Sequence, residues 1–556
     1  MEPLNELAFD VVVVGTGVCG ALISHKLSQR GVRVLMLEAG PDQRANRIQM
    51  AGAYVASANR NLSAPYFDGI VPPDILGPDS SKGYYDQSSV RSEQLQSTFQ
   101  RTVGGSTWHF LGNMPRFVPS DFELYSRYHK GVDWPISYEV LEPYYTIAEK
   151  EIGVAGDHDA WNDYLGAFRS KPYPMHAIWP AYGDKFFDSI SGRSYQDESD
   201  GSARVVQVLR TPQARNSTIY DGRPACAGNS TCTPICPIQA KYDASVHIKK
   251  ATATGAHLIS SALVKKLEVD PKTGVITHLS VLRYGATAES REESLDISNK
   301  TVIIAANAIE TPRLLLMSGI SKGGVGLHLM DHLQGYALAE ASEPIYPFRG
   351  PITTSGIDVF RDGKFRSESA AFRISIGNDG WGREGSPAKE TWKLLLEDKF
   401  GPGLRAAVRD RLTRMHRISF STEMLPEATN RVELSAKVDA FGLPRPKITF
   451  SFPDYNKRAF LHAGRVAEWL YKQTGWTQRP LDKLEPSGAG HIIGTTRMGT
   501  ASSNSFADSF GAAHEHPNLY VAGPCLFPTA GTANPTLTAV ALALRTADRL
   551  LQLLVP

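Results

Sequence analysis

The start of the chain carries the feature that most limits its possible folds. Val11–Val14 is a short β-branched run, and glycines follow it directly at positions 15, 17 and 20, before a helix predicted over 21–30. This order of strand, glycine-rich turn and helix is typical of a dinucleotide-binding unit. Gly15 allows the tight turn, Gly17 lets the backbone approach a pyrophosphate, and Gly20 lets helix and strand pack closely. The sequence therefore predicts an α/β fold with a parallel sheet.

An acidic residue follows the second predicted strand. Val32–Leu37 ends at Glu38, where a carboxylate can accept hydrogen bonds from ribose hydroxyls and disfavours a 2′-phosphate. The candidate ligands are then NAD and FAD, and the alternative interpretation is a glycine-rich turn of some other α/β protein. No second G-x-G-x-x-G follows a strand, so we expect one dinucleotide.

The end of the chain supplies a second motif that suits a flavin. Asn518–Gly523 is predicted as a buried strand, and an apolar helix is predicted to follow, with Asn534 as its N-cap and Pro535 at its first position. The free N–H groups at such a helix end stabilise negative charge. A flavin ring acquires that charge when it accepts a hydride, so FAD is the expected cofactor.

Further motifs extend the pattern along nearly the whole chain. Together with the two ends, they resemble the glucose-methanol-choline (GMC) flavoprotein oxidoreductases, and they are Gly104–His109, Asn307–Gly319, Asp331 with His332, Leu425 with Pro426, Asn430 with Arg431, His491–Gly499, and Asn518–Leu537. The resemblance implies a Rossmann-like FAD-binding domain and a second α+β substrate domain built on an antiparallel sheet. The resemblance also implies further cofactor-binding residues, namely Gly104, Gly105, Thr107, Gly523, Pro535 and Thr536.

The resemblance also predicts a discontinuous domain organisation. The FAD-binding domain is expected from residues 1–125, 205–330 and 480–556, and the substrate domain from residues 126–204 and 331–479. Within the substrate domain, Arg431–Ser435 and Lys447–Phe452 have the β-rich pattern expected for the floor of its antiparallel sheet.

Oxidation of an alcohol by hydride transfer requires a base that removes the hydroxyl proton. Histidine suits this task near neutral pH, and the resemblance places the base at His491 and an anchor for the substrate oxygen at Asn534. The alternatives are a structural histidine and a plain helix cap. The expected reaction is oxidation of a hydroxyl of a sugar, polyol or sugar acid. An oxidase resembling pyranose oxidases or glycoside 3-oxidases, and a flavin-binding protein without turnover, are the other hypotheses.

Three of the five cysteines form a cluster in the sequence. Cys226, Cys232 and Cys236 lie in a segment rich in Gly, Asn and Pro. Thiolates at this spacing suit an iron-sulfur centre, and a three-iron cluster fits three ligands better than tetrahedral zinc does. One disulfide with a free thiol, or three reduced buried cysteines, are the alternatives. The surrounding residues resemble the large subunits of bacterial sugar and sugar-acid dehydrogenase complexes, which implies a 3Fe-4S cluster that relays electrons.

The same resemblance predicts partner subunits. A cytochrome c subunit would accept electrons, and a small subunit would carry the export signal that the first residues of this chain lack. The expected location is the periplasmic face of the bacterial inner membrane, with the cytoplasm as the alternative. The 556 residues are 42% hydrophobic and carry a net charge of +2, with no block of like charges. This excludes a disordered chain and predicts neither nucleic-acid binding nor a membrane span.

Overall fold

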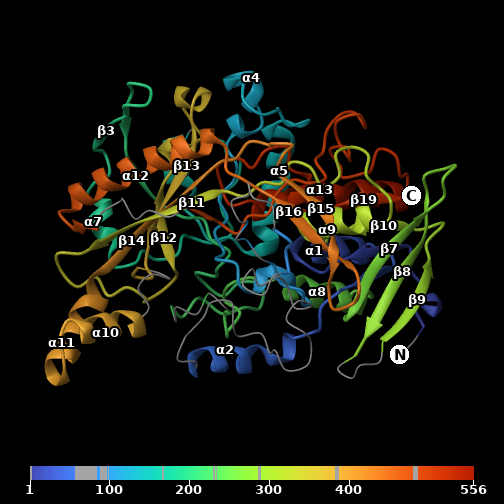
Figure 1. The fold of residues 1–556 in the computed structure, drawn as a ribbon, viewed down its shortest axis with the longest axis horizontal. Coiled ribbons are helices and arrows are strands. Elements are labelled where there is room, and N and C mark those ends of the chain that lie inside the picture. The colour runs from blue at the N-terminus through green and yellow to red at the C-terminus, as the bar shows by residue number, and fades with distance from the viewer. Residues whose placement is uncertain are drawn as a thin grey trace.

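The protein contains two large sheets that lie side by side (Figure 1). The computed structural model describes residues 3–56, 84–87, 95, 97, 99–165, 168–228, 232, 235–285, 290–381, 387–479 and 486–555. The first sheet is parallel and includes the strand at the beginning of the chain. The second is antiparallel and is formed mainly by the middle of the chain.

The parallel sheet assembles strands that are far apart in the sequence. Its order is β19-β10-β1-β2-β6, from Leu519–Val521, Thr301–Ile304, Val11–Val14, Val34–Leu37 and His257–Ile259. All residues of β1 and β2 are buried, because helices cover parallel strands on both faces. Helix α1 (Val18–Ser28) packs against α8 (Ser245–Ala253) and against α13 (Thr536–Leu554). The predicted α/β fold with a Rossmann-like sheet is confirmed.

Between β6 and β10 the chain forms a separate antiparallel sheet. It consists of β7 (Ala262–Val269), β8 (Ile276–Tyr284) and β9 (Ser290–Asp296), and it stands at the right of Figure 1. Helix α9 (Asn307–Met317) follows β10 and packs against β7.

The second large sheet has seven strands, all paired antiparallel. Its order is β17-β11-β14-β13-β12-β5, with β18 also beside β11. In that order the strands are Thr477–Gln478, Leu333–Glu340, Met415–Thr422, Phe372–Gly377, Thr353–Ile357 and Val208–Arg210, with β18 at Ser487–Gly488. Helix α12 (Asp454–Thr474) packs on β11 and β14 and places its apolar face on the sheet.

Smaller elements connect and flank these layers. The helices are α2 (Arg47–Ala56), α4 (Leu124–Tyr128), α5 (Tyr138–Ile152), α6 (His158–Leu165), α7 (Asp184–Asp188), α10 (Pro387–Leu396) and α11 (Gly401–Arg414). The strands are β3 (Ser194–Gln196), β4 (Ala203–Val205), β15 (Arg431–Val438) and β16 (Pro444–Thr449).

The structure differs from the sequence-based expectations in four elements. Strands β15 and β16 were expected in the floor of the antiparallel sheet, but they pair with each other and pack on α9. Strand β5 belongs to the seven-stranded sheet, although residues 205–330 were assigned to the FAD-binding domain. Helix α5, assigned to the substrate domain, packs on α13 beside the parallel sheet. The chain thus passes between the two sheets at positions that differ from the domain boundaries predicted from the motifs.

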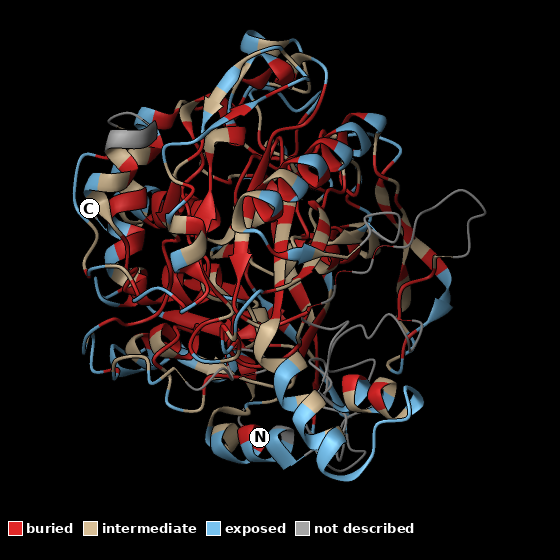
Figure 2. Ribbon diagram, turned by 90° about the vertical axis from the view of Figure 1, so that its left-hand side faces the viewer, coloured by how far each residue is buried: buried red, intermediate tan, exposed pale blue. Residues whose placement is uncertain are grey.

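Buried residues fill the region between and within the sheets, and exposed residues gather on the outer helices (Figure 2). The main hydrophobic core is continuous from the parallel sheet to the antiparallel one. No helix in the described ranges is long and apolar enough to cross a bilayer.

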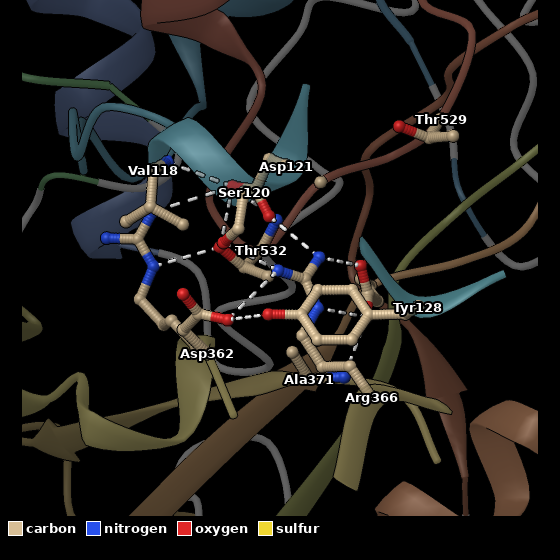
Figure 3. A network of polar contacts seen from close by, with 12 residues as sticks. Val118, Ser120, Asp121, Tyr128, Asp362, Arg366, Ala371, Thr529 and Thr532 are labelled. Atoms are coloured by element: carbon tan, nitrogen blue, oxygen red, sulfur yellow. Dashed lines mark hydrogen bonds and ion pairs between the residues drawn. The ribbon is translucent and has the colours of Figure 1, made fainter. Parts of the chain in front are cut away.

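A buried polar network joins the antiparallel sheet to the turn before α13 (Figure 3). The guanidinium of Arg366 donates to Asp121 at 3.0 Å and to Glu423 at 2.6 Å. Asp121 in turn accepts a hydrogen bond of 2.8 Å from the hydroxyl of Thr532, which also accepts one of 3.0 Å from Arg361. Arg366, Asp121 and Glu423 are fully buried, so each charge depends on its partners for stabilisation. The network fixes the position of the turn that carries Asn534.

Removing the central cation of this network should destabilise the fold strongly. Arg366→Met leaves Asp121 and Glu423 buried with fewer compensating charges, and we expect a loss of about 3–5 kcal/mol in the free energy of unfolding. Chemical denaturation measures this change. Arg409→Met, on the exposed surface of α11, is the control and should change the value by less than about 0.5 kcal/mol. A loss below about 1 kcal/mol in Arg366→Met would show that the network does not stabilise this region.

Candidate active site

The glycine-rich turn after β1 leaves open space at one of its three glycines. Gly15 has φ +98°, and a Cβ there would lie 2.6 Å from the carbonyl oxygen of Ala305. A Cβ on Gly20 would lie 2.1 Å from the carbonyl oxygen of Gly15, whereas one on Gly17 would meet nothing within 4 Å. Gly15 and Gly20 are therefore required by the packing of the protein itself. Gly17 borders free space at the N-terminus of α1, where an anionic group is stabilised.

Glu38 lies at the end of β2 and faces the same turn. Its carboxylate accepts hydrogen bonds from the backbone N–H of Thr16 at 2.9 Å, from the Thr16 hydroxyl at 2.7 Å and from the N–H of Gly40 at 2.9 Å. Burial raises the pKa of Glu38, and these hydrogen bonds oppose that shift. The structure thus brings Glu38 and the glycine turn together as the sequence predicts.

The Gly104–Gly105 turn lies against the first glycine turn. The N–H of Gly104 is 3.3 Å from the hydroxyl oxygen of Thr16, and a Cβ on Gly105 would lie 3.2 Å from the Cα of Gly17. Both glycines have positive φ, +100° and +57°, a conformation that favours glycine. Thr16 therefore links the two turns, a role that nothing in the motif indicated.

Thr107 supports the Gly104–Gly105 turn from behind. Its hydroxyl donates to the carbonyl oxygen of Gly104 at 2.6 Å and accepts from the N–H of Ala244 at 2.9 Å. The side chain is buried, and both contacts are to the protein's own backbone.

The open space at Gly17, the acceptor at Glu38 and the N-terminus of α1 together fit a bound dinucleotide.

The start of α13 differs from the prediction in its cap. The helix begins at Thr536, Pro535 occupies the cap position, and no side chain caps the first turn. Asn534 was expected as the N-cap, but its amide nitrogen lies 3.0 Å from Nε2 of His491 instead. Gly523, at φ +128°, follows β19 and begins the segment that leads to this turn.

His491 and Asn534 therefore meet, although 43 positions separate them. Both residues are half-buried, so part of each remains accessible to solvent. Burial, together with the neighbouring His332, holds the pKa of His491 well below 6.5. The imidazole is thus neutral at neutral pH and can accept a proton.

The backbone of His491 is fixed by a buried carboxylate. Asp331 accepts a hydrogen bond from the N–H of His491 at 2.9 Å and another from the hydroxyl of Ser97. Ser97 in turn accepts one from the N–H of Gly490 at 2.9 Å. Burial raises the pKa of Asp331 to about 6. Asp331 thus anchors the loop that carries the histidine.

The ring of His491 contacts a second histidine that sequence reasoning did not assign to the site. Nδ1 of His332 lies 2.9 Å from Nδ1 of His491, and Nε2 of His332 lies 3.1 Å from the carbonyl oxygen of Gly531. Burial lowers the pKa of His332 to about 4. In the sequence, His332 is marked only as part of the Asp331–His332 motif, one of the segments that resemble the GMC family.

Asp331, His332 and His491 also lie close enough to hold a metal ion, with ligand atoms within 4.8 Å of one another. Hydrogen bonds within the protein already engage these atoms on all three side chains. The geometry is that of a hydrogen-bonded chain, and it accounts for the short distances without an ion.

The three clustered cysteines are free thiols, and residues 229–231 and 233–234 between them lie outside the described residues. Cys232 and Cys236 are buried and Cys226 is half-buried. Burial raises the pKa of Cys226, and the two other thiols reinforce the shift. Among the described residues, the three sulfur atoms are not gathered closely enough to share a single ion.

The described end of the cysteine segment, Ile235 and Cys236, lies beside Trp108, which follows the Gly104–Gly105 turn. Ile235 lies in one buried cluster with Trp108, and the guanidinium of Arg47 is stacked 4.7 Å above the Trp108 ring while it donates to the carbonyl oxygen of Cys236 at 3.0 Å. Lys241 donates to the carbonyl oxygens of Trp108 and Phe110 at 2.9 and 2.6 Å. Burial lowers the pKa of Lys241 to about 8, while Cys232 and Cys236 act to raise it.

The glycine turn offers a matched pair of variants. Gly17→Ala fills the open space with a methyl group, so we expect purified protein to lose most of its bound dinucleotide while the unliganded protein keeps its melting temperature. Gly20→Ala forces a clash with the backbone and should lower that temperature. Absorbance at the flavin band and thermal unfolding measure the two effects. Full flavin content in Gly17→Ala would contradict a pyrophosphate at this turn.

Comparison with known proteins identifies the fold and the family. Family models described as GMC oxidoreductase match residues 208–334 and 426–543. Fructose dehydrogenase large subunit from Gluconobacter japonicus is 35% identical over 98% of each chain. 2-Methyl-1,2-propanediol dehydrogenase from Mycolicibacterium austroafricanum is 27% identical over 97% of this chain and 94% of that protein.

A solved structure shows the same fold. Pyridoxine 4-oxidase superposes with a TM-score of 0.63 at 19% identity, over 98% of this chain and 99% of that one. The family models, the full-length similarity to a dehydrogenase subunit and the glycine turn beside Glu38 agree with one another. The chain belongs to the GMC oxidoreductases, FAD-binding enzymes that act on CH–OH donors.

Proposed function

We propose that the protein is a dehydrogenase that oxidises a hydroxyl group of a sugar, polyol or sugar acid and passes the electrons to a protein acceptor. The observation that carries this proposal is the contact of 3.0 Å between His491 and Asn534. The two groups are hydrogen-bonding partners of each other, so an oxygen that enters between them would meet a lone-pair acceptor and an amide donor side by side. A hydroxyl group needs such a pair, because its oxygen accepts one hydrogen bond while its proton leaves.

The chemistry assigns a separate role to each side chain. Nε2 of His491 accepts the hydroxyl proton, and the Asn534 amide donates a hydrogen bond to the substrate oxygen as it becomes a carbonyl. FAD, held at the Gly17 and Glu38 site, supplies the acceptor for the hydride that leaves the same carbon. One C–H and one O–H bond break, a carbon–oxygen double bond forms, and two electrons leave with the hydride.

The low pKa of His491 keeps the imidazole available as a base, although it also weakens the affinity of the ring for a proton. A base acts in its unprotonated form, and the lowered pKa keeps that form populated through neutral and mildly acidic pH. Once protonated, the ring keeps His332 as the acceptor for its Nδ1–H. The imidazolium therefore stays hydrogen-bonded inside the protein while the product leaves.

The similarity to a fructose dehydrogenase subunit supports a sugar-type substrate. D-Fructose is the first compound to test, and D-glucose, D-gluconate and D-sorbitol complete the panel.

An iron-sulfur cluster at Cys226, Cys232 and Cys236 is the proposed exit for electrons. The thiols are free and mostly buried, and Ile235, next to Cys236, packs on Trp108 beside the Gly104–Gly105 turn. A multi-iron cluster occupies more space than one ion, so its ligands need not gather as closely as those of a single metal. A one-electron carrier in this place would separate the electron pair delivered by the flavin.

The proposal includes the partners of such a carrier. A cytochrome c subunit would take single electrons, and a small subunit would bring the complex to the periplasmic face of the inner membrane. The name of the Gluconobacter japonicus relative, a large subunit, supports an assembly of this kind.

The role of His491 can be tested by reducing the flavin with substrate under anaerobic conditions. His491→Ala should lower the limiting rate of flavin reduction by about 10²–10⁴-fold, because the base is missing. Flavin content should be unchanged. Stopped-flow absorbance with the best compound of the panel gives the rate.

The wild-type protein adds a pH test to the same measurement. The limiting rate should stay constant from pH 8 down to pH 6, because the base remains unprotonated over this range. A rate in His491→Ala equal to that of the wild type, or an acid limb centred at pH 6.5, would contradict the assignment.

The cluster makes a separate prediction. Protein purified without oxygen should contain iron and sulfide and show broad absorption beside the flavin bands. Cys232→Ser should lose both the iron and the broad absorption, while Cys525→Ser, a buried cysteine outside the segment, should retain them. If the wild-type protein contains no iron and forms hydrogen peroxide with a sugar, the protein is an oxidase and the dehydrogenase proposal is wrong.

A further inference from the structure

The hydrogen bonds around His332 determine which nitrogen of His491 carries a proton. The carbonyl oxygen of Gly531 can only accept, so Nε2 of His332, 3.1 Å away, must donate to it. His332 is neutral because burial lowers its pKa to about 4, and a neutral imidazole has one donor and one acceptor nitrogen. Nδ1 of His332 is therefore an acceptor.

The same reasoning extends to the next ring. Nδ1 of His491 lies 2.9 Å from Nδ1 of His332, so the proton between these two nitrogens must belong to His491. Its Nε2 then has a free lone pair, and this is the atom that faces the Asn534 amide at 3.0 Å. An amide N–H donates to such a lone pair, so the contact on the far side of the ring requires the same tautomer.

We infer that His332 is a positioning residue that holds His491 in the tautomer able to act as a base. This inference rests on the proposed role of His491 and adds the means by which it is achieved. His332 is buried and touches His491 with its edge, with ring planes at 89°, so it fixes both the proton and the orientation of the ring.

Without this acceptor, only the Asn534 amide would still favour the tautomer with a proton on Nδ1, and that proton would have no partner at position 332, so the second tautomer would become accessible. In the second tautomer, Nε2 carries a proton and cannot remove another from a hydroxyl group. Substrate would still bind, because the Asn534 amide and the walls of the site are unchanged. A defect in His332 should therefore reduce the rate of the chemical step more than the apparent affinity for substrate.

Two substitutions at His332 separate the tautomer effect from a change in packing. His332→Phe keeps a ring and removes the acceptor, and we expect the limiting rate of flavin reduction to fall about tenfold or more with KM changed less than about threefold. His332→Asn places an amide oxygen near the position of Nδ1 and should recover most of that rate. The substrate is the panel sugar or polyol that reduces the wild-type flavin fastest, and bound flavin is measured in each variant.

His416→Phe is the matched control. His416 is also buried, with Nδ1 3.1 Å from the hydroxyl of Tyr471. It pairs with Ala339 near the far end of β11, about 20 Å along the strand from His332. Its replacement should leave the rate of flavin reduction unchanged. An equal loss of rate in His416→Phe and His332→Phe would overturn the inference, since any buried histidine would then have the same effect.

The tautomer itself can be observed in the wild-type holoenzyme. Nitrogen-15 spectra of protein labelled at the histidine rings should show Nδ1 of His491 protonated and Nε2 unprotonated, with the signals assigned by their loss in His491→Asn. In His332→Phe the two signals should shift toward a mixture of tautomers. A proton on Nε2 in the wild type would overturn the inference, whatever the variants do.

The outcomes also distinguish this inference from the proposed function. Normal flavin reduction in His491→Ala would remove the base assignment and the inference together. A loss of rate in His491→Ala, combined with a wild-type rate in His332→Phe, would leave the base assignment intact and exclude His332 as its positioning residue.

Discussion

The site depends on one continuous hydrogen-bonded chain that begins and ends in the same turn. It runs from the carbonyl of Gly531 through His332 and His491 to the amide of Asn534, three residues after its start. Because the Gly531 carbonyl can only accept, His332 must donate to it, and this fixes which nitrogen donates and which accepts in each following hydrogen bond. The turn before α13 therefore sets both partners of the proposed base: the acceptor behind the ring and the donor in front of it.

A buried polar network holds that turn in place. Thr532, between Gly531 and Asn534, is held by Asp121 and Arg361, and Asp121 is neutralised by Arg366 from the antiparallel side. Such buried charges cost desolvation free energy, and they stabilise only when every partner is present. The network thus connects the antiparallel layer to the turn that carries Asn534, whose amide contacts His491. On the other side, Thr16 joins the two glycine turns that would enclose the cofactor.

The parts of the site that the sequence could predict are those encoded over a short stretch. Gly15, Gly17, Gly20 and Glu38 follow from the local order of strand, glycine turn, helix and strand, and His491 follows from the resemblance of its motif to the GMC family. His332 could not be assigned in this way, because its function arises from a contact across 159 positions of sequence. Asn534 was predicted both as the cap of the helix and as the anchor for the substrate oxygen; the structure shows no side-chain cap at that helix end, and it places the Asn534 amide against His491.

The same distinction applies to the fold. Three strands of the parallel sheet, β1, β2 and β19, could be predicted because each is a short apolar run that is buried throughout. The partners of β15 and β16 could not, since an alternating pattern is the same in a two-stranded ribbon on α9 and in the floor of a sheet. Likewise, the spacing of the cysteines can be read from the sequence, whereas the position of Ile235 beside Trp108 depends on packing between distant segments.

The most direct test of the central claim is a crystal structure of the reduced holoenzyme with the oxidised product, or of the oxidised enzyme with an unreactive substrate analogue. The account predicts one oxygen of that molecule within about 2.6–3.2 Å of both Nε2 of His491 and the amide nitrogen of Asn534, with His332 still against Nδ1. A ligand oxygen held by other groups, with His491 turned away from it, would contradict the account.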